Sequence, residues 1–172
     1  TMASARRGLV SLLLIARHCT TSARVMTLSL ADDLANSALK EARERDLKPV
    51  TITVVDEAGR VIVSKREDAC GNTIPDFALA KSRSCVGMGM STRALRDKYA
   101  EKPTQLACMA TISPLAPFPG GVLLRGADGS SVIGAIGISG AAADEDEHCA
   151  VVAARSHGIV SEPASSQLEG PG

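Results

Sequence analysis

Glycines and acids crowd residues 134–147 in a pattern reminiscent of phosphate-binding segments. The run Gly134-Ala-Ile-Gly137-Ile-Ser-Gly140 has the spacing GxxGxxG, whereas a dinucleotide-binding loop has GxGxxG directly after a strand. Here the glycines fall within an expected strand, and four consecutive acids, Asp144–Glu147, follow them. These acids complement a helix dipole but would repel a phosphate. The pattern therefore favours close backbone packing over phosphate binding, with metal binding by the acids as a less favoured alternative.

Three histidines supply side chains suited to general-base catalysis or metal ligation. His18 falls in an N-terminal segment that we expect to be removed, and His157 lies in the last turn of an expected helix, where its charge complements the dipole. His148 is the strongest functional candidate, with a surface or interface role as the alternative. Asp144 lies four residues before His148 on the same helical face, but the sequence offers no third metal ligand there.

The sulfur-bearing side chains allow two interpretations. Met88, Met90 and Met109 have thioethers that can ligate a soft metal or haem iron, although methionine more often fills a core. The cysteines form no C-x-x-C pair and no zinc-ligand spacing, so we expect reduced thiols, mostly buried. The cysteines are Cys19, Cys70, Cys85, Cys108 and Cys149. Since the chain also has no G-x-S-x-G nucleophile elbow and no Cys/His catalytic arrangement, the motifs alone identify no catalytic set.

Composition excludes some functions. The 172 residues include 19 basic and 19 acidic side chains, and the formal net charge is zero. A general nucleic-acid-binding protein normally carries a basic surplus. The three aromatic side chains, Phe77, Tyr99 and Phe118, are also too few for a base-stacking platform. We therefore expect no nucleic-acid partner.

The N-terminal segment differs in charge from the rest of the chain. Residues 1–31 contain four arginines and no Asp or Glu, together with several hydroxyl side chains. This composition predicts a mitochondrial transit peptide or a disordered extension over residues 1–26. A secretory signal is one alternative, and translation from Met26 into a cytoplasmic protein is another. No apolar run approaches the roughly 20 residues that span a bilayer, so we expect no stable membrane insertion.

Hydrophobic periodicity and turn residues predict one folded unit over residues 27–160. Helical patterns cover residues 30–45, 74–86, a short segment ending near Tyr99, and 145–157, with Ser29 as the expected first N-cap. Five segments are strand-like: 50–55, 60–64, 106–112, 122–125 and 131–139. Residues 161–172 are polar and rich in Ser, Pro and Gly, which predicts a disordered tail. The pattern indicates an α+β domain with an antiparallel sheet.

Five ordered blocks of sequence resemble the GlcG/HbpS family, also called the haem-degrading domain and found as the C-terminal domain of PduO-type proteins. They cover about residues 29–157. The blocks are Ile52-Thr-Val-Val-Asp56-Glu57-Ala-Gly59-Arg-Val-Ile-Val with the following residues 66–69; Ala78-Leu-Ala-Lys81 with the segment 90–95; Phe118-Pro119-Gly120-Gly121-Val122; Val132-Ile-Gly134-Ala-Ile-Gly137-Ile-Ser139-Gly140; and Asp146-Glu147. Ser82 and Ser91 depart from the usual Ala and Pro, and Glu145 replaces a usual Gln.

The resemblance implies a profilin-like fold of α/β/α layers with a five-stranded antiparallel sheet, assembled as a homo-oligomer. It also implies binding of haem or a related tetrapyrrole and a role in redox or iron stress. An enzyme acting on haem or a small organic metabolite, and a ligand-free assembly subunit, are alternatives. Candidate cofactor-binding residues lie at strand ends, turns and helix faces, where glycines let a ligand approach the backbone. They are Asp56, Glu57, Lys81, Gly120, Gly121, Ser139, Gly140 and His148.

The scarcity of aromatic residues limits how a haem could be held. With no Trp and only three other aromatic side chains, aromatic pocket walls are not available. We therefore expect a haem pocket built from Leu, Ile, Val and Met, completed across a subunit interface.

Overall fold

The architecture is known from a computed structural model, which describes residues 25–169. The elements along the chain are helix α2 (Leu28–Glu44), strands β1 (Thr51–Asp56) and β2 (Val61–Arg66), helices α3 (Ile74–Met88), α4 (Thr92–Tyr99) and α5 (Pro103–Ile112), strands β3 (Gly121–Arg125) and β4 (Val132–Ser139), helix α6 (Ala143–Ser156), strand β5 (Val160–Glu162) and a 3-10 turn (Gln167–Glu169).

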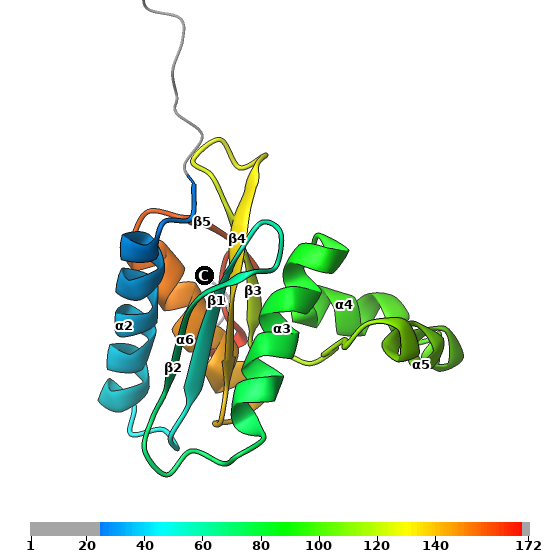
Figure 1. Ribbon diagram of the computed structural model, residues 1–172, viewed down its shortest axis with the longest axis horizontal. Coiled ribbons are helices and arrows are strands. Elements are labelled where there is room, and N and C mark those ends of the chain that lie inside the picture. The colour runs from blue at the N-terminus through cyan, green and yellow to red at the C-terminus, as the bar shows by residue number, and fades with distance from the viewer. Residues whose placement is uncertain (1–24, 170–172) are drawn as a thin grey trace, which may run out of the picture.

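The strands form one antiparallel sheet in the order β2-β1-β4-β3-β5. Helices α2 and α6 cover one face, and α3 covers the other (Figure 1). Helices α4 and α5 follow α3, and α5 projects away from the sheet (Figure 1). The predicted α+β fold with α/β/α layers and five antiparallel strands is therefore confirmed.

The larger hydrophobic core lies between the sheet and the helix pair α2–α6. Small side chains on the helices meet branched and aliphatic side chains from alternate strand positions, as the two-residue period of a strand requires. Fully buried members include Leu34, Ala38, Ile52, Ile136 and Ala150. A core of this kind needs no aromatic side chains, which agrees with the composition.

Helix α3 lies unusually close to the opposite face of the sheet because glycines face it there. A Cβ atom at Gly137 would collide with the carbonyl oxygen of Ala78 on α3, and one at Gly121 would approach the carbonyl oxygen of Lys81 within 2.8 Å. Within residues 132–140, the glycines thus permit close contact between backbones. The close-packing interpretation of the glycine run is confirmed.

Three local predictions were wrong. The apolar segment Leu106–Ile112, expected as a strand, lies in helix α5, which begins at Pro103. The fifth strand is instead β5, which pairs with β3 and takes part of the segment expected to be a disordered tail. Helix α2 begins earlier than predicted, because the Thr27 hydroxyl, rather than Ser29, accepts a hydrogen bond as its N-cap.

The predicted leader over residues 1–26 falls almost wholly outside the described residues, as do His18 and Cys19, so the mitochondrial location stays a prediction. Met26 is already part of the core, with 5% of its surface exposed. Within the described part of the chain, none of the helices combines the length and the apolar character needed to cross a membrane.

Candidate functional site

The candidate residues from the sequence occupy three separate places. The register of β1 against β4 pairs Thr51 with Ser139 and Asp56 with Gly134, so Ser139 and Asp56 lie at opposite ends of the sheet. Lys81 contacts Gly120 from the α3 side. Gly121 begins β3 and Gly140 follows β4, at the same end as Ser139. Asp56 and Glu57 lie at the turn between β1 and β2, whereas His148 lies on α6 across the sheet. The eight residues do not form one pocket.

Lys81 is a buried cation on the side of α3 that faces the sheet. Only 1% of it is exposed, and its Nζ donates to the carbonyl oxygen of Ile138 (2.7 Å) and to Oδ2 of Asp146 (2.9 Å). The ammonium group also lies 4.9 Å from the centre of the Phe118 ring. Gly120 adjoins it with a φ of +119°, where a Cβ would collide with Nζ. Lys81 is therefore fully engaged within the fold.

A second buried ion pair lies beside the first. Nε of Arg93, on α4, donates to both carboxylate oxygens of Glu147 at 2.9 and 3.0 Å, and Glu147 has no exposed surface. The backbone N–H of Gly121 donates to the Thr92 hydroxyl oxygen at 2.9 Å. We call Lys81, Asp146, Arg93 and Glu147 the inner charge cluster. It attaches the start of α6 to α3 and α4.

Burial dominates the electrostatics of this cluster. It raises the pKa of Asp146 to about 6, although the nearby Lys81 ammonium and the Ala141 N–H oppose the shift. Burial likewise lowers the pKa of Lys81, against the attraction of Asp146. Because Lys81 and Asp146 are only 1% and 2% exposed, a ligand in solvent cannot reach them without opening the fold. The cluster therefore serves to hold elements together.

Asp56 has a local structural role. Its Oδ1 accepts hydrogen bonds from the backbone N–H groups of Ala58 (2.9 Å) and Arg60 (2.8 Å), which fixes the turn between β1 and β2. Glu57, beside it, is exposed to solvent. Asp56 thus shapes the rim of this end of the sheet.

His148 is buried between α6, α2 and the C-terminal segment, and 3% of it is exposed. Its Nδ1 forms a hydrogen bond with the Ser166 hydroxyl at 2.6 Å, and its Nε2 with Glu41 Oε1 at 3.1 Å. Both ring nitrogens are therefore engaged, which leaves no nitrogen for an iron atom in this conformation. Among residues 25–169, no three His, Cys, Asp or Glu side chains come together in a group that could hold a metal ion.

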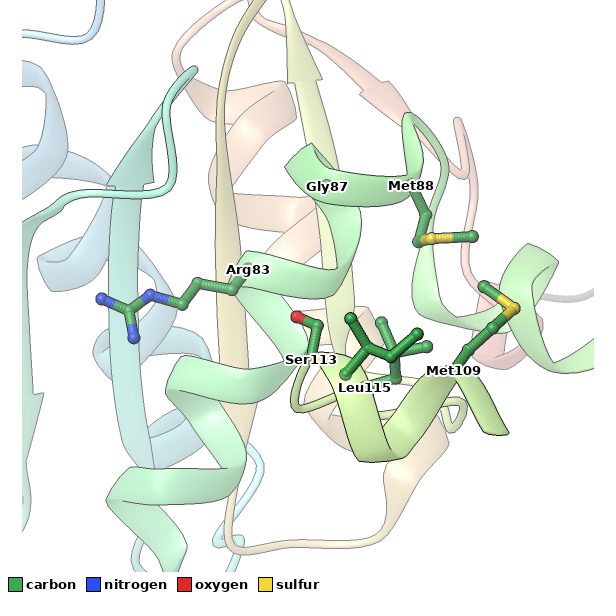
Figure 2. A pocket seen from close by; sticks show the side chains of 7 residues that line it. Arg83, Gly87, Met88, Met109, Ser113 and Leu115 are labelled. Atoms are coloured by element: carbon green, nitrogen blue, oxygen red, sulfur yellow. The ribbon is translucent and has the colours of Figure 1, made fainter. Parts of the chain in front are cut away.

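An open, mostly apolar cavity lies on the outer side of α3, facing α5. We call it the methionine groove; its volume is about 270 Å³. Figure 2 shows Met88 of α3 and Met109 of α5 at one end, with Leu115 beside Met109 and Arg83 extending away from the thioethers. Its lining residues are Arg83, Gly87, Met88, Met109, Ile112, Ser113 and Leu115. The groove presents two thioethers on a hydrophobic wall. Such a surface can hold an apolar ligand that carries a metal ion able to accept a thioether sulfur.

A second pocket, of about 540 Å³, adjoins the methionine groove and shares Arg83 and Ser113 with it. We call it the hairpin pocket, because the turn between β1 and β2 forms one wall and α3 another. Its remaining lining residues are Ala58, Gly59, Arg60, Asp76, Leu79, Ala80 and Pro114. Neither pocket was predicted from the sequence, although two of the three candidate methionines, Met88 and Met109, line the groove.

Comparison with known proteins gives a consistent family. The model of the HbpS-like family, described as haem degrading protein HbpS-like, matches residues 26–155. The chain is similar to the crystal structure of HbpS (26% identity, TM-score 0.68, covering 80% of this chain and 93% of that one). It is also similar to the PduOC–haem complex (25%, 0.70, 79% and 97%) and to Klebsiella pneumoniae protein ORFY (26%, 0.66, 78% and 93%). No curated protein matches the sequence.

Proposed function

We propose that this chain, which belongs to the HbpS-like family of haem degrading proteins, binds haem or a related tetrapyrrole in the methionine groove as a homo-oligomer. Family membership and the similarity to a PduOC–haem complex support a haem-related function. The observation that carries the location is the presence of two thioethers along one open, mostly apolar cavity outside α3. A role in redox or iron stress, implied by the family resemblance, is part of the same proposal.

The donor set of the groove suits haem. Methionine thioethers are axial ligands of haem iron in proteins, and Ile112 and Leu115 supply the hydrophobic contact that a porphyrin ring needs. Met88 and Met109 come from different helices, so their thioethers approach the groove from separate sides (Figure 2). When bound, haem would supply a redox-active iron; the chain's own residues would position it and exclude water.

The size of the groove indicates why a second copy of the chain belongs to the site. Ligand sites that enclose a molecule of this class usually measure about 300–1,000 Å³. The groove, at about 270 Å³, is smaller and open on one side. A single chain would therefore cover only part of a haem, and a neighbouring copy is the cover that we propose.

Helix α5 supports this oligomer. None of its residues is buried, although it carries Leu106, Met109 and Ile112, and 87% of Ile112 is exposed. A helix with apolar side chains and no buried face lacks part of its packing. Its position beside the groove means that a partner covering α5 would also close the groove.

Titration with haemin tests the function. The full chain at about micromolar concentration should give a saturable shift of the Soret band, with a stoichiometry of at most one haem per chain. Failure to bind under these conditions would remove the proposed function. The absorbance of the bound haem, followed with a reductant and oxygen and compared with heat-denatured protein, distinguishes simple binding from degradation.

Variants test the location. Met88→Leu and Met109→Leu keep the hydrophobic volume but remove a thioether, so each should shift the Soret maximum and weaken haem binding. Met90→Leu is the matched control, because Met90 lies just beyond α3 and does not line the groove. Identical spectra for all three variants would move the haem site elsewhere while leaving haem binding itself intact.

A further inference from the structure

We propose that the hairpin pocket binds a second ligand, a short zwitterion of the ω-amino carboxylate class. Its carboxylate would pair with Arg60 and Arg83 and its ammonium group with Asp76. The hairpin pocket and this class of ligand are distinct from the groove and the tetrapyrrole proposed above. Opposite charges lie at the two ends of this pocket with apolar side chains between them, and a hydrogen bond from Arg83 to Gly59 joins two of its walls.

The charges lie at two ends of one stripe on α3. Asp76 and Arg83 are seven residues apart, two helical turns, and both line the pocket. At the rise of an α-helix this separation is about 10 Å along the axis. Leu79 and Ala80 lie between them and also line the pocket. The pocket therefore has an acidic end, an apolar middle and a basic end.

The basic end is held in place by the turn between β1 and β2. Nε of Arg83 donates to the carbonyl oxygen of Gly59 at 3.1 Å, which leaves its terminal nitrogens available for a ligand carboxylate. The backbone N–H of Arg60 donates to Oδ1 of Asp56, and the Arg60 side chain forms a long ion pair with the same acid, with Nη1 3.8 Å from Oδ2. Two guanidinium groups therefore line one end; Arg60 makes only this long ion pair with Asp56, and Arg83 pairs with no carboxylate among the described residues.

The acidic end carries a carboxylate without a protein cation. Across the described residues, Asp76 forms no ion pair and no side-chain hydrogen bond, in contrast to Asp56 and Asp146. Asp76 lies in the first turn of α3 and is exposed to solvent at this end of the pocket. A ligand ammonium group is the natural partner for such a carboxylate.

The spacing selects the length of the ligand. A chain of about four methylenes can cross Leu79 and Ala80 while its ends remain within hydrogen-bond reach of side chains about 10 Å apart on the helix axis. The pocket volume of about 540 Å³ accommodates such a molecule together with water. The probe we choose is 5-aminopentanoate.

Isothermal titration of the full chain with three probes tests the charge pattern. The zwitterion 5-aminopentanoate should bind, whereas pentanoate, which lacks the ammonium, and pentylamine, which lacks the carboxylate, should each bind at least about threefold more weakly. Equal affinity for pentanoate and the zwitterion would overturn the role of Asp76. Failure of 5-aminopentanoate to bind at millimolar concentration would overturn the proposal.

Variants separate this site from the haem site. Arg60 and Asp76 line only the hairpin pocket, whereas Arg83 lines both pockets. Arg60→Gln should weaken binding of both 5-aminopentanoate and pentanoate, and Asp76→Asn should weaken only that of the zwitterion. Arg96→Gln, at an exposed arginine paired with Asp97 on α4, is the control. Haemin binding should be unchanged in all three, so either proposal can fail without the other; an effect of Arg96→Gln equal to that of Arg60→Gln would reduce the pocket to general charge attraction.

Discussion

The two sides of α3 differ in how they treat charge. On the inner side, Lys81 is 1% exposed and paired with Asp146 at 2.9 Å against the closely packed sheet. On the outer side, two residues further along, Arg83 is exposed and lines two pockets. One helix thus carries a cation that holds the fold together and a cation that is available to ligands. Sequence conveys that both are basic, but only packing separates their roles.

The largest expected effect comes from removing each cation in turn. Lys81→Met should lower the free energy of unfolding by about 3–5 kcal/mol, because it leaves the Asp146 carboxylate buried without its cation. Arg83→Met, the same change on the outer side, should alter it by less than about 0.5 kcal/mol. Urea unfolding measures both. Similar losses for the two variants would erase the distinction between the sides.

Glycine-to-alanine changes test the packing behind that distinction. Gly137→Ala should cost up to about 3 kcal/mol, because the new Cβ would collide with the α3 backbone at Ala78 and force the helix away. Gly87→Ala is its counterpart on the outer side: nothing lies within 4 Å of the added Cβ. It should stabilise the protein by about 0.5–1 kcal/mol through helix propensity. The same unfolding experiment applies, and a neutral Gly137→Ala would contradict the close approach.

The inner cluster should also respond to pH. The pKa of Asp146 is raised from 3.8 to about 6 by burial, so the folded state binds more protons than the unfolded chain between these values. The contribution of this carboxyl to stability therefore falls as the pH rises from about 4 to about 6. Removing Lys81 raises the pKa of Asp146 further. The loss in free energy of unfolding caused by Lys81→Met should therefore be smaller at pH 5 than at pH 7, by about 1 kcal/mol or more.

Unfolding of wild type and Lys81→Met across that pH range provides the test. Arg83→Met serves as the reference, because it removes a cation that does not face Asp146. A deficit of Lys81→Met that stays constant or grows on acidification would show that Asp146 does not sense the loss of Lys81.

The smallest effect on stability is expected on α5. Ile112→Asp should change the free energy of unfolding of the single chain by less than about 0.5 kcal/mol, because 87% of Ile112 is already exposed. It should nevertheless shift sedimentation velocity toward smaller species, since a charge would be buried in the proposed interface. Leu28→Asp, at a 66% exposed residue on α2, is the control. An unchanged sedimentation profile for Ile112→Asp would remove α5 from the interface.

Local sequence patterns predicted the elements that pack against the core. The β-branched run of β1, the turn at Asp56–Gly59 and the helical period of α2 each reflect neighbours within the same domain. Helix α5 was misread as a strand, because its apolar residues follow no one-sided period. None of them is buried, so no core face imposed such a pattern. Pro103 at its first turn was the available signal for a helix.

Contacts between distant residues account for what the sequence did not reveal. Lys81 and Asp146 are 65 residues apart, and each alone resembles an ordinary surface charge. The sequence made His148 a candidate ligand, but Ser166 and Glu41, from two other segments, form hydrogen bonds with both its ring nitrogens. The short strand β5 has only three residues, and it is stable because β3 supplies its partner. The family resemblance predicted the fold correctly, but the candidate residues chosen with it lie in three separate regions of the structure.

The central claim, that haem is held by the thioethers outside α3, is tested most directly by methionine methyl signals. Carbon-13-labelled methionine methyl groups of the full chain, recorded by NMR during titration with haemin, should show broadening and shifts of Met88 and Met109, assigned through their Leu variants. The signals of Met90 and the core residue Met26 should change much less. An equal amount of 5-aminopentanoate in place of haemin should leave the Met88 and Met109 signals nearly unchanged. Broadening of Met90 or Met26 while Met88 and Met109 remain sharp would contradict the account.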